Sequence, residues 1–279
     1  MSGVDAAEIT DVTLRVADLP RALAFYEDVL GLTGVTARDS VSLSADAGSS
    51  PLIALEAAPE APPRPRQSAG LFHVAILYPD AAALGRILRR LLDFGVPIGS
   101  ADHGVSQALY LSDLEGNGLE LYVDRPRDRW PSSEDGQVAM FTDTLAFAPL
   151  LEAGRAPGPL MPEGTRVGHI HLSVASLANA ERFYGDLLGF AVTQRNYPGA
   201  LFLARGGYHH HIGANIWHSQ TPVQPGVLGL ARFTVRLDDE EFQAAAGRLE
   251  AAGQIESRES GWGVARDLDG LHVRLASRR

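Results

Sequence analysis

Two histidines and one glutamate, His73, His169 and Glu120, fall at matching places in a repeated pattern of strands and helices. His73 and His169 each lie near the start of an alternating apolar strand, and Glu120 lies on the last strand of the pattern that contains His73. Two imidazoles and one carboxylate form the donor set that binds Fe(II) on one face and leaves the opposite face open. These residue types therefore predict a mononuclear iron site that is suited to oxygen chemistry.

The composition limits the chemistry available to such a site. The chain has 279 residues and a formal net charge of −10, and its lysine-plus-arginine total of 24 consists of arginine alone. This balance argues against broad binding to nucleic acid or to a membrane surface, because both need a basic face. An anionic ligand would need local arginines. The absence of cysteine excludes disulfides, iron–sulfur clusters and thiolate zinc sites, so a bound metal must use histidine and carboxylate.

The sequence shows no targeting or membrane-spanning segment. The N-terminal stretch MSGVDAAEIT lacks a basic region followed by an apolar run, so we expect no secretory signal. No apolar run approaches the length that a bilayer requires. A cytoplasmic location is the expectation.

An internal repeat dominates the chain. Residues 11–32, DVTLRVADLPRALAFYEDVLGL, match residues 169–190, HIHLSVASLANAERFYGDLLGF, at a constant offset. Each copy begins with apolar residues at alternate positions, which is typical of a strand, and continues with apolar residues at helical spacing. Gly31 and Gly189 are expected to end the two helices.

Two weaker copies raise the number of strand–helix–strands modules to four. They begin at LFHVAILYPD and GLARFTVRLDD, and each ends in a hairpin with an acidic–glycine turn. From first to fourth, the modules span residues 8–58, 70–125, 167–218 and 227–276. With about 100–200 residues to a domain, this spacing predicts two domains, 8–125 and 167–276, joined by a partly ordered linker over 126–166.

The modules differ in the side chains that they offer at equivalent positions. The first strands offer Asp11, His73, His169 and Arg232. The last strands offer Glu56, Glu120, the run His209–His211, and His272. Arginine has no acceptor atom and cannot coordinate a metal, so the metal-binding candidates concentrate in the second and third modules. His171 shares a strand face with His169 and is the alternative ligand there.

The four modules resemble the βαβββ units of the vicinal oxygen chelate superfamily, which includes glyoxalase I, fosfomycin-resistance proteins and the type I extradiol dioxygenases. Four modules in a chain of this length most resemble the catechol-2,3-dioxygenase group. The resemblance implies an α+β fold in which four βαβββ modules pair into cupped mixed sheets. Because the superfamily supports several chemistries, the resemblance supports the fold more strongly than the reaction.

The same resemblance assigns roles to individual residues. It implies that His73, His169 and Glu120 bind the metal, which requires the second and third modules to meet. The stretch DHGVSQALYLSDLEGNGLELY resembles the family segment in which a histidine and a tyrosine, here His103 and Tyr110, hydrogen-bond the substrate oxygens. The run HHHIGA resembles the family signature of the acid–base histidine, which places that role at His210.

Each assignment has a plainer structural alternative. Strand alternation favours His209 and His211 over His210, unless a bulge near Gly206–Gly207 or Gly213 reverses the faces. The other candidates also have structural explanations. His73 and His169 would be buried strand histidines, and Glu120 an exposed strand glutamate. His103 would be a solvated loop histidine, and Tyr110 a packing residue.

We therefore expect an Fe(II) extradiol dioxygenase that cleaves a small aromatic diol with O2 in aromatic hydrocarbon catabolism, with Mn(II) as the alternative metal. The competing interpretations are a glyoxalase-like metal-dependent isomerase or transferase, and a non-catalytic small-molecule binding protein. Neither nucleic acid nor a membrane is an expected partner, and association into a homo-oligomer is left open.

Overall fold

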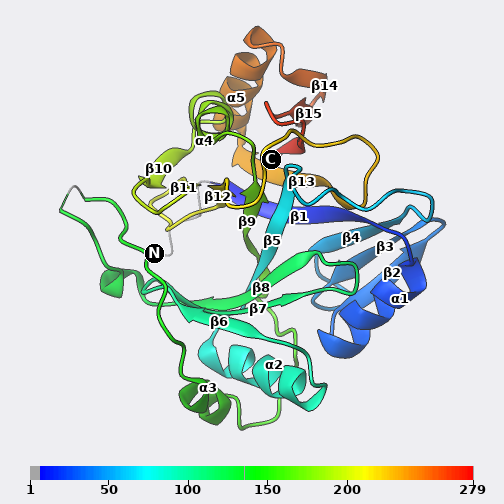
Figure 1. Cartoon of the computed structure of the whole chain (residues 1–279), viewed down its shortest axis with the longest axis vertical. Helices are drawn as coiled ribbons and strands as arrows, with labels where there is room; N and C mark the ends of the chain where they lie inside the picture. The colour runs from blue at the N-terminus through cyan, green and yellow to red at the C-terminus, as the bar shows by residue number, and fades with distance from the viewer. Residues whose placement is uncertain (1–6, 135, 279) are drawn as a thin grey trace. The chain divides into compact units, whose positions relative to one another are not determined.

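The computed structural model describes residues 7–134 and 136–278. Within this part of the chain, strands β1 to β16 form two mixed sheets of eight strands each, and helices accompany every module (Figure 1). This arrangement confirms the predicted α+β class and the four βαβββ modules in mixed sheets. None of the helices described is long and apolar enough to span a membrane.

The modules follow one another along the chain with the predicted element order (Figure 1). The first contains β1 (Ala7–Val16), α1 (Leu19–Ala24), η1 (Phe25–Val29), β2 (Thr33–Ala37), β3 (Ser40–Ser44) and β4 (Ile53–Ala57). The second contains β5 (Gly70–Leu77), α2 (Ala81–Asp93), β6 (Gly99–Asp102), β7 (Ser106–Ser112) and β8 (Gly118–Asp124).

The second half repeats this order after a connection that contains η2 (Arg127–Arg129) and α3 (Phe147–Ala153). The third module contains β9 (Arg166–Ser173), α4 (Leu177–Ala180), η3 (Glu181–Leu187), β10 (Ala191–Gln194), β11 (Ala200–Ala204) and β12 (Ile212–Asn215). The fourth contains β13 (Gly229–Asp238), α5 (Asp239–Ala251), β14 (Ile255–Glu259), β15 (Trp262–Arg266) and β16 (His272–Arg278).

The helix ends follow the sequence signals. The side chains of Asp80 and Asp238 accept hydrogen bonds from the backbone N–H groups three residues further on and cap α2 and α5. In the first and third modules the helix widens into the π-helical segments η1 and η3. Two residues after the end of each segment, Gly31 and Gly189 both have φ of +81°, as a glycine just beyond the C-terminal end of a helix permits.

The described chain forms two compact units. Unit 1 comprises residues 7–15, 60–72 and 168–278, and unit 2 comprises residues 16–59 and 73–167 without residue 135. Each unit is a set of residues that pack together. The domains predicted at 8–125 and 167–276 follow the repeat in the sequence instead, and they stay a prediction.

Unit 1 contains two groups of neighbouring strands. The first has the order β14-β15-β16-β13-β1, in which β13 pairs in parallel with β16 and antiparallel with β1. The second has the order β10-β11-β12-β9, with β12 parallel to β9. The first strand of the first module therefore pairs with the first strand of the fourth.

Unit 2 likewise contains two groups of strands. The antiparallel strands β2, β3 and β4 form one group, and the order β6-β7-β8-β5, with β5 parallel to β8, forms the other. The segment predicted as the linker, 126–166, belongs to this unit, and the structure describes it at every position except residue 135. Its helix α3 packs against α2 at Gly85 and Gly154, and Tyr78 Oη donates to Met161 Sδ at 3.5 Å.

A buried tyrosine–aspartate hydrogen bond occurs once in each unit at equivalent positions of the repeat. Tyr26 Oη donates to Asp113 Oδ2 at 3.0 Å in unit 2, and Tyr184 Oη donates to Asp267 Oδ2 at 2.8 Å in unit 1. Each bond joins the helix of one module to the terminal hairpin of the next module along the chain. Burial raises the pKa of Asp267 to about 6, although hydrogen bonds from Tyr184 and from the backbone N–H of Leu271 oppose that shift.

Candidate metal centre

In unit 2, His73 and Glu120 meet as a buried pair. His73 Nε2 lies 2.8 Å from Glu120 Oε2, and the two side chains are 7% and 3% exposed. His73 lies on β5 and Glu120 on the parallel neighbour β8, where Ala75 is aligned with Glu120. The parallel register brings the two predicted ligands together on neighbouring strands, although they are 47 positions apart in the sequence.

Tyr110 and His103 continue this group of polar side chains. Tyr110 on β7 is aligned with Glu120 on β8, and its ring centroid lies 5.6 Å from that of His73. Its hydroxyl lies 2.6 Å from His103 Nε2. The other ring nitrogen of His103, Nδ1, lies 2.7 Å from the carbonyl oxygen of Phe141, which can only accept. In a neutral His103 the proton is therefore on Nδ1, and Nε2 accepts the Tyr110 hydroxyl proton.

The turn that carries His103 is fixed by its neighbours. The backbone N–H of Gly104 donates to Asp102 Oδ1 at 3.0 Å, and Asp102 forms an ion pair with Arg125. Partial burial opposes ionisation of Asp102, but the hydrogen bonds from Arg125 and from Gly104 outweigh it and lower the pKa of this carboxyl group. An ionised Asp102 thus holds the start of the loop in which His103 lies.

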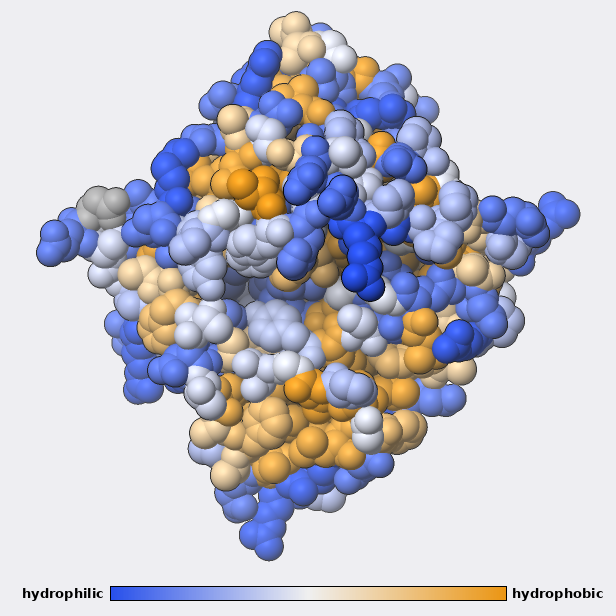
Figure 2. Space-filling model, viewed as in Figure 1, coloured by the Kyte–Doolittle hydropathy of each residue, from blue (hydrophilic) through white to orange (hydrophobic). Residues whose placement is uncertain are grey.

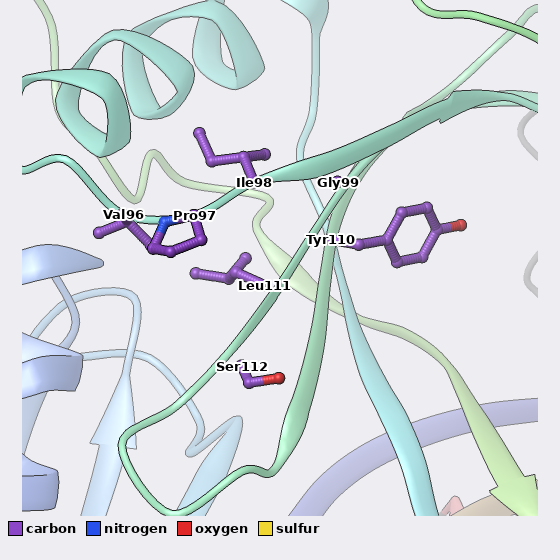
Figure 3. A pocket seen from close by; sticks show the side chains of 7 residues that line it. All are labelled: Val96, Pro97, Ile98, Gly99, Tyr110, Leu111 and Ser112. Carbon is purple, nitrogen blue, oxygen red and sulfur yellow. The ribbon is translucent and has the colours of Figure 1, made fainter.

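The Tyr110 ring points away from an open apolar groove on the other side of its strand. Val96, Pro97 and Ile98 line this groove together with Leu111 and Ser112. Figure 3 shows the Tyr110 ring directed away from these side chains. The groove neighbours the end of α2, where Leu92 and Phe94 are 46% and 52% exposed, and Figure 2 shows apolar surface in orange over that helix.

His169 lies in unit 1 on β9 and is 1% exposed. Its ring centroid lies 4.1 Å from that of His210 and 6.1 Å from that of His209. His209 Nδ1 lies 2.8 Å from His210 Nδ1, so one of these two nitrogens carries the proton and donates to the other.

The structure distinguishes the three consecutive histidines. The backbone of His211 bonds to Leu203 and Ile170 in the manner of a strand, and its ring packs against Tyr208 and Phe190. The backbone N–H of Arg205 also donates to His211 Nδ1 at 3.3 Å. The chain bends at His209 and His211 before β12 begins, and the ring centroid of His210 lies 4.1 Å from that of His169.

An aromatic wall lies beside these histidines in unit 1. The His171 ring centroid lies 5.0 Å from Phe72, 5.5 Å from Trp217 and 5.7 Å from Phe202. A Cβ on Gly213 would lie 2.9 Å from Cγ of His171, so this glycine leaves room for the ring. The sequence pattern gave no signal for Phe202 or for the carbonyl group of Phe141, because both act through contacts that are distant in sequence.

The donors in unit 2 fit a metal ion. Two donor atoms that each lie about 2.0–2.2 Å from one ion at a right angle are about 3 Å apart. His73 Nε2 and Glu120 Oε2 have a separation of 2.8 Å, which matches this value. A neutral imidazole and a carboxylate are also ligands that coordinate a ferrous or manganous ion. Metal coordination would offset the cost of burying the Glu120 charge.

The model of the Glyoxalase/Bleomycin resistance protein/Dioxygenase superfamily matches residues 8–121 and 166–273. These two segments make up most of the chain, so the protein belongs to this superfamily, as the resemblance of its modules indicated.

A catechol-2,3-dioxygenase of Bacillus subtilis (strain 168) is 42% identical to this chain over 269 residues, which cover 93% of this chain and 94% of the relative. Two solved structures share the fold. Glyoxalase I from Zea mays superposes with a TM-score of 0.59 at 15% identity, over 98% of this chain and 93% of its own. The cppA protein from Streptococcus pneumoniae TIGR4 gives a TM-score of 0.59 at 11% identity, over 97% and 99%.

Proposed function

We propose that the protein is a metal-dependent dioxygenase that cleaves the ring of a catechol-like substrate with O2. The observation that carries this proposal is the buried His73–Glu120 pair, with its donor atoms 2.8 Å apart. The 42% identity to a catechol-2,3-dioxygenase over nearly the whole chain favours this reaction over the others of the superfamily.

We propose that His73, Glu120 and His169 bind one Fe(II), with Mn(II) as the alternative metal. A ferrous ion with three protein ligands on one face would supply open positions at which a diol and dioxygen can bind. Glu120 would balance part of the metal charge. The parallel register of β5 and β8 would hold the His73 and Glu120 donors in place without reorganisation.

Tyr110 and His103 would accept a proton from a substrate hydroxyl. The Phe141 carbonyl oxygen accepts from His103 Nδ1, which leaves His103 Nε2 to accept from the Tyr110 hydroxyl. The Tyr110 oxygen could then accept a hydrogen bond from a substrate hydroxyl. Proton transfer from Tyr110 to His103 would accompany ionisation of that hydroxyl, which general-base assistance of this kind favours.

His210 would act as the second acid–base group. Its ring lies against His169, and its Nδ1 lies 2.8 Å from His209 Nδ1. When His209 donates in this contact, the proton of a neutral His210 is on Nε2, from which it can be given to a departing oxygen. The nearby wall of Phe72, Phe202 and Trp217 offers ring faces and edges to an aromatic substrate.

The proposal is tested with protein purified anaerobically and loaded with Fe(II). We expect ring cleavage of catechol that stops when oxygen is removed, and near-stoichiometric iron by elemental analysis. His73→Ala, His169→Ala and Glu120→Gln should each lose most of the iron and at least a thousandfold in kcat/KM. His218→Ala, which removes an exposed histidine, is the matched control and should behave as the wild type.

Two results would contradict the proposal. Retention of iron in both His73→Ala and His169→Ala would remove the assigned ligands. Turnover of a hemithioacetal without oxygen, in the absence of ring cleavage, would instead indicate a glyoxalase-like isomerase.

A further inference from the structure

We propose a second binding site in unit 1, for a small carboxylate with an apolar body. It is a partly enclosed cavity of about 190 Å3 between the end of β1, the loop before β13, and the hairpin that joins β15 to β16. Its wall includes Arg15, Val223, Val227, Arg266, Leu271 and His272. Neither His169 nor His210 lines this cavity.

The strand face beside this cavity is basic, although the chain as a whole is acidic. The pairing of β1 with β13 shifts register between Thr13 and Leu14, so that Arg232 is aligned with Thr13. Thr13 and Arg15 share a face of β1, and Arg232 therefore lies on the same face of the sheet as Arg15. Arg236 follows on the same face as Arg232 and forms an ion pair with Glu8 at 3.5 Å. In the aligned first strands of the modules, Arg232 replaces the histidine of the third module. The fourth module, whose strand β13 pairs with β1, thus offers a cation at the position where the second and third modules offer imidazoles and the first offers Asp11.

Arg15 is the cation best placed to bind a ligand. It lies on β1 opposite Gly229, and its side chain is half-buried. Among the described residues, Arg15 takes part in no side-chain hydrogen bond or ion pair. By contrast, Arg266 and His272 already share Glu256, at 2.8 Å and 3.3 Å. A half-buried guanidinium on a cavity wall favours a carboxylate, because the two groups can form a pair of parallel hydrogen bonds.

The remaining wall is apolar and shaped by the chain. Val227 and Leu271 are 7% and 2% exposed, and Val223 adds its side chain from the opposite loop. The backbone N–H of Val223 donates to the Asp269 carbonyl oxygen at 2.7 Å, which holds this loop against the hairpin. The ligand should therefore have one charged end for Arg15 and an apolar end for the valines and leucines.

Cavity size and charge narrow the ligand class further. A volume of about 190 Å3 is well below the range of about 300–1,000 Å3 that suits drug-sized ligands, so the ligand should be no larger than a single ring with one substituent. One unengaged arginine suits a monoanion. Phosphate would gain more from several cations, and the second arginine of this wall, Arg266, is already paired with Glu256.

The test uses benzoate as the probe and calorimetric titration of the full chain in its metal-loaded form. We expect binding to the wild type in the millimolar range or tighter, at least tenfold weaker binding to Arg15→Gln, and at least tenfold weaker binding of neutral benzamide. Arg182→Gln removes an exposed arginine of the same unit and is the matched control. Val223→Trp fills the cavity without altering Arg15 and should also weaken binding at least tenfold.

A further variant distinguishes this cavity from the proposed metal centre. His73→Ala should bind benzoate as the wild type does, and loss of binding in this variant would assign the anion to the proposed metal centre instead. The proposal is overturned if the wild type does not bind benzoate, or if Val223→Trp and a folded Arg15→Gln both bind it with unchanged affinity. Thermal unfolding of each variant establishes that it is folded before titration.

Discussion

At the scale of single residues, the His73–Glu120 pair shows how a buried charge is accommodated. A carboxylate that is 3% exposed is costly to bury, and a metal ion that Glu120 shared with His73, whose Nε2 lies 2.8 Å away, would offset that cost. Removal of His73 alone would leave that charge uncompensated, whereas Glu120→Gln keeps a polar acceptor at the same place. The glutamine variant is therefore the cleaner test of metal binding, because it disturbs folding less.

Tyr110→Phe tests the proton-transfer role within unit 2. The substitution removes the hydroxyl at 2.6 Å from His103 Nε2 but keeps the ring beside His73. We expect a fall in kcat of about a hundredfold, in the range typical of general acid–base groups, with unchanged iron content and KM changed less than kcat. Steady-state kinetics across pH and iron analysis measure these effects.

The control for this variant is Tyr78→Phe, which removes a buried hydroxyl that donates to Met161 Sδ instead. An equal loss of kcat in both variants would indicate a general packing effect and not a role for the Tyr110 hydroxyl.

At the scale of secondary-structure elements, a glycine pair sets the approach of α3 to α2. A Cβ built on Gly85 would overlap the backbone carbonyl group of Leu150 and lie 2.8 Å from the backbone nitrogen of Gly154. Backbone atoms of α3 cannot yield as the end of a flexible side chain can. The absence of a side chain at Gly85 thus allows the segment predicted as a linker to pack against the second module.

Gly85→Ala should therefore lower the free energy of unfolding by about 1–3 kcal/mol, the usual cost of overpacking a core. Alanine in place of a helical glycine normally stabilises by about 0.4–1 kcal/mol, so the overlap reverses the expected sign. Denaturant unfolding measures the difference. Gly247→Ala in α5, where a Cβ would meet nothing within 4 Å, is the matched control and should be stabilising. A stabilising Gly85→Ala would contradict the proposed close packing.

At the scale of the whole molecule, the repeat preserves the interactions that join modules as well as the modules themselves. Tyr26–Asp113 and Tyr184–Asp267 occupy equivalent positions, and each joins a helix to the hairpin of the following module. In both hairpins the other carboxylate oxygen accepts two backbone N–H bonds within the turn, with donors at 2.8–2.9 Å. In each hairpin, one aspartate thus stabilises its own turn and joins that turn to the helix of the preceding module.

Asp267 should make the stability of the protein depend on pH. Burial raises its pKa from 3.8 to about 6, so the folded state holds this proton more tightly than the unfolded state does. Its stabilising contribution is complete below about pH 4 and is lost as pH rises through about 6, with an upper limit of about 3 kcal/mol at about 1.4 kcal/mol per pKa unit.

Asp267→Asn removes this proton equilibrium and keeps an acceptor oxygen. The free energy of unfolding of this variant, measured by urea at pH 5 and pH 7.5, should fall less between the two pH values than that of the wild type. Asp186→Asn makes the same change of charge at an exposed position and serves as the control. An identical pH dependence in wild type and Asp267→Asn would refute the raised pKa.

The sequence alone determined the features that depend on local periodicity. Alternating apolar residues identified the strands, and the match of residues 11–32 to 169–190 identified the repeat. Gly31 and Gly189 end their helices as predicted, because a positive φ at the end of a helix is a local requirement. The resemblance of these repeated modules to a known superfamily then implied the fold class and the candidate residues, because the repeat and its motifs can be read in the order of the residues.

Tertiary structure decided which side chains meet. Strand alternation favoured His211, but the bend before β12 brings His210 to His169. The parallel register of β5 and β8 joins His73 to Glu120, and a carbonyl group from the predicted linker fixes the proton on His103. These contacts depend on register, on bends and on the return of distant segments. They are set by the packing of the whole unit, and a local sequence pattern carries no record of them.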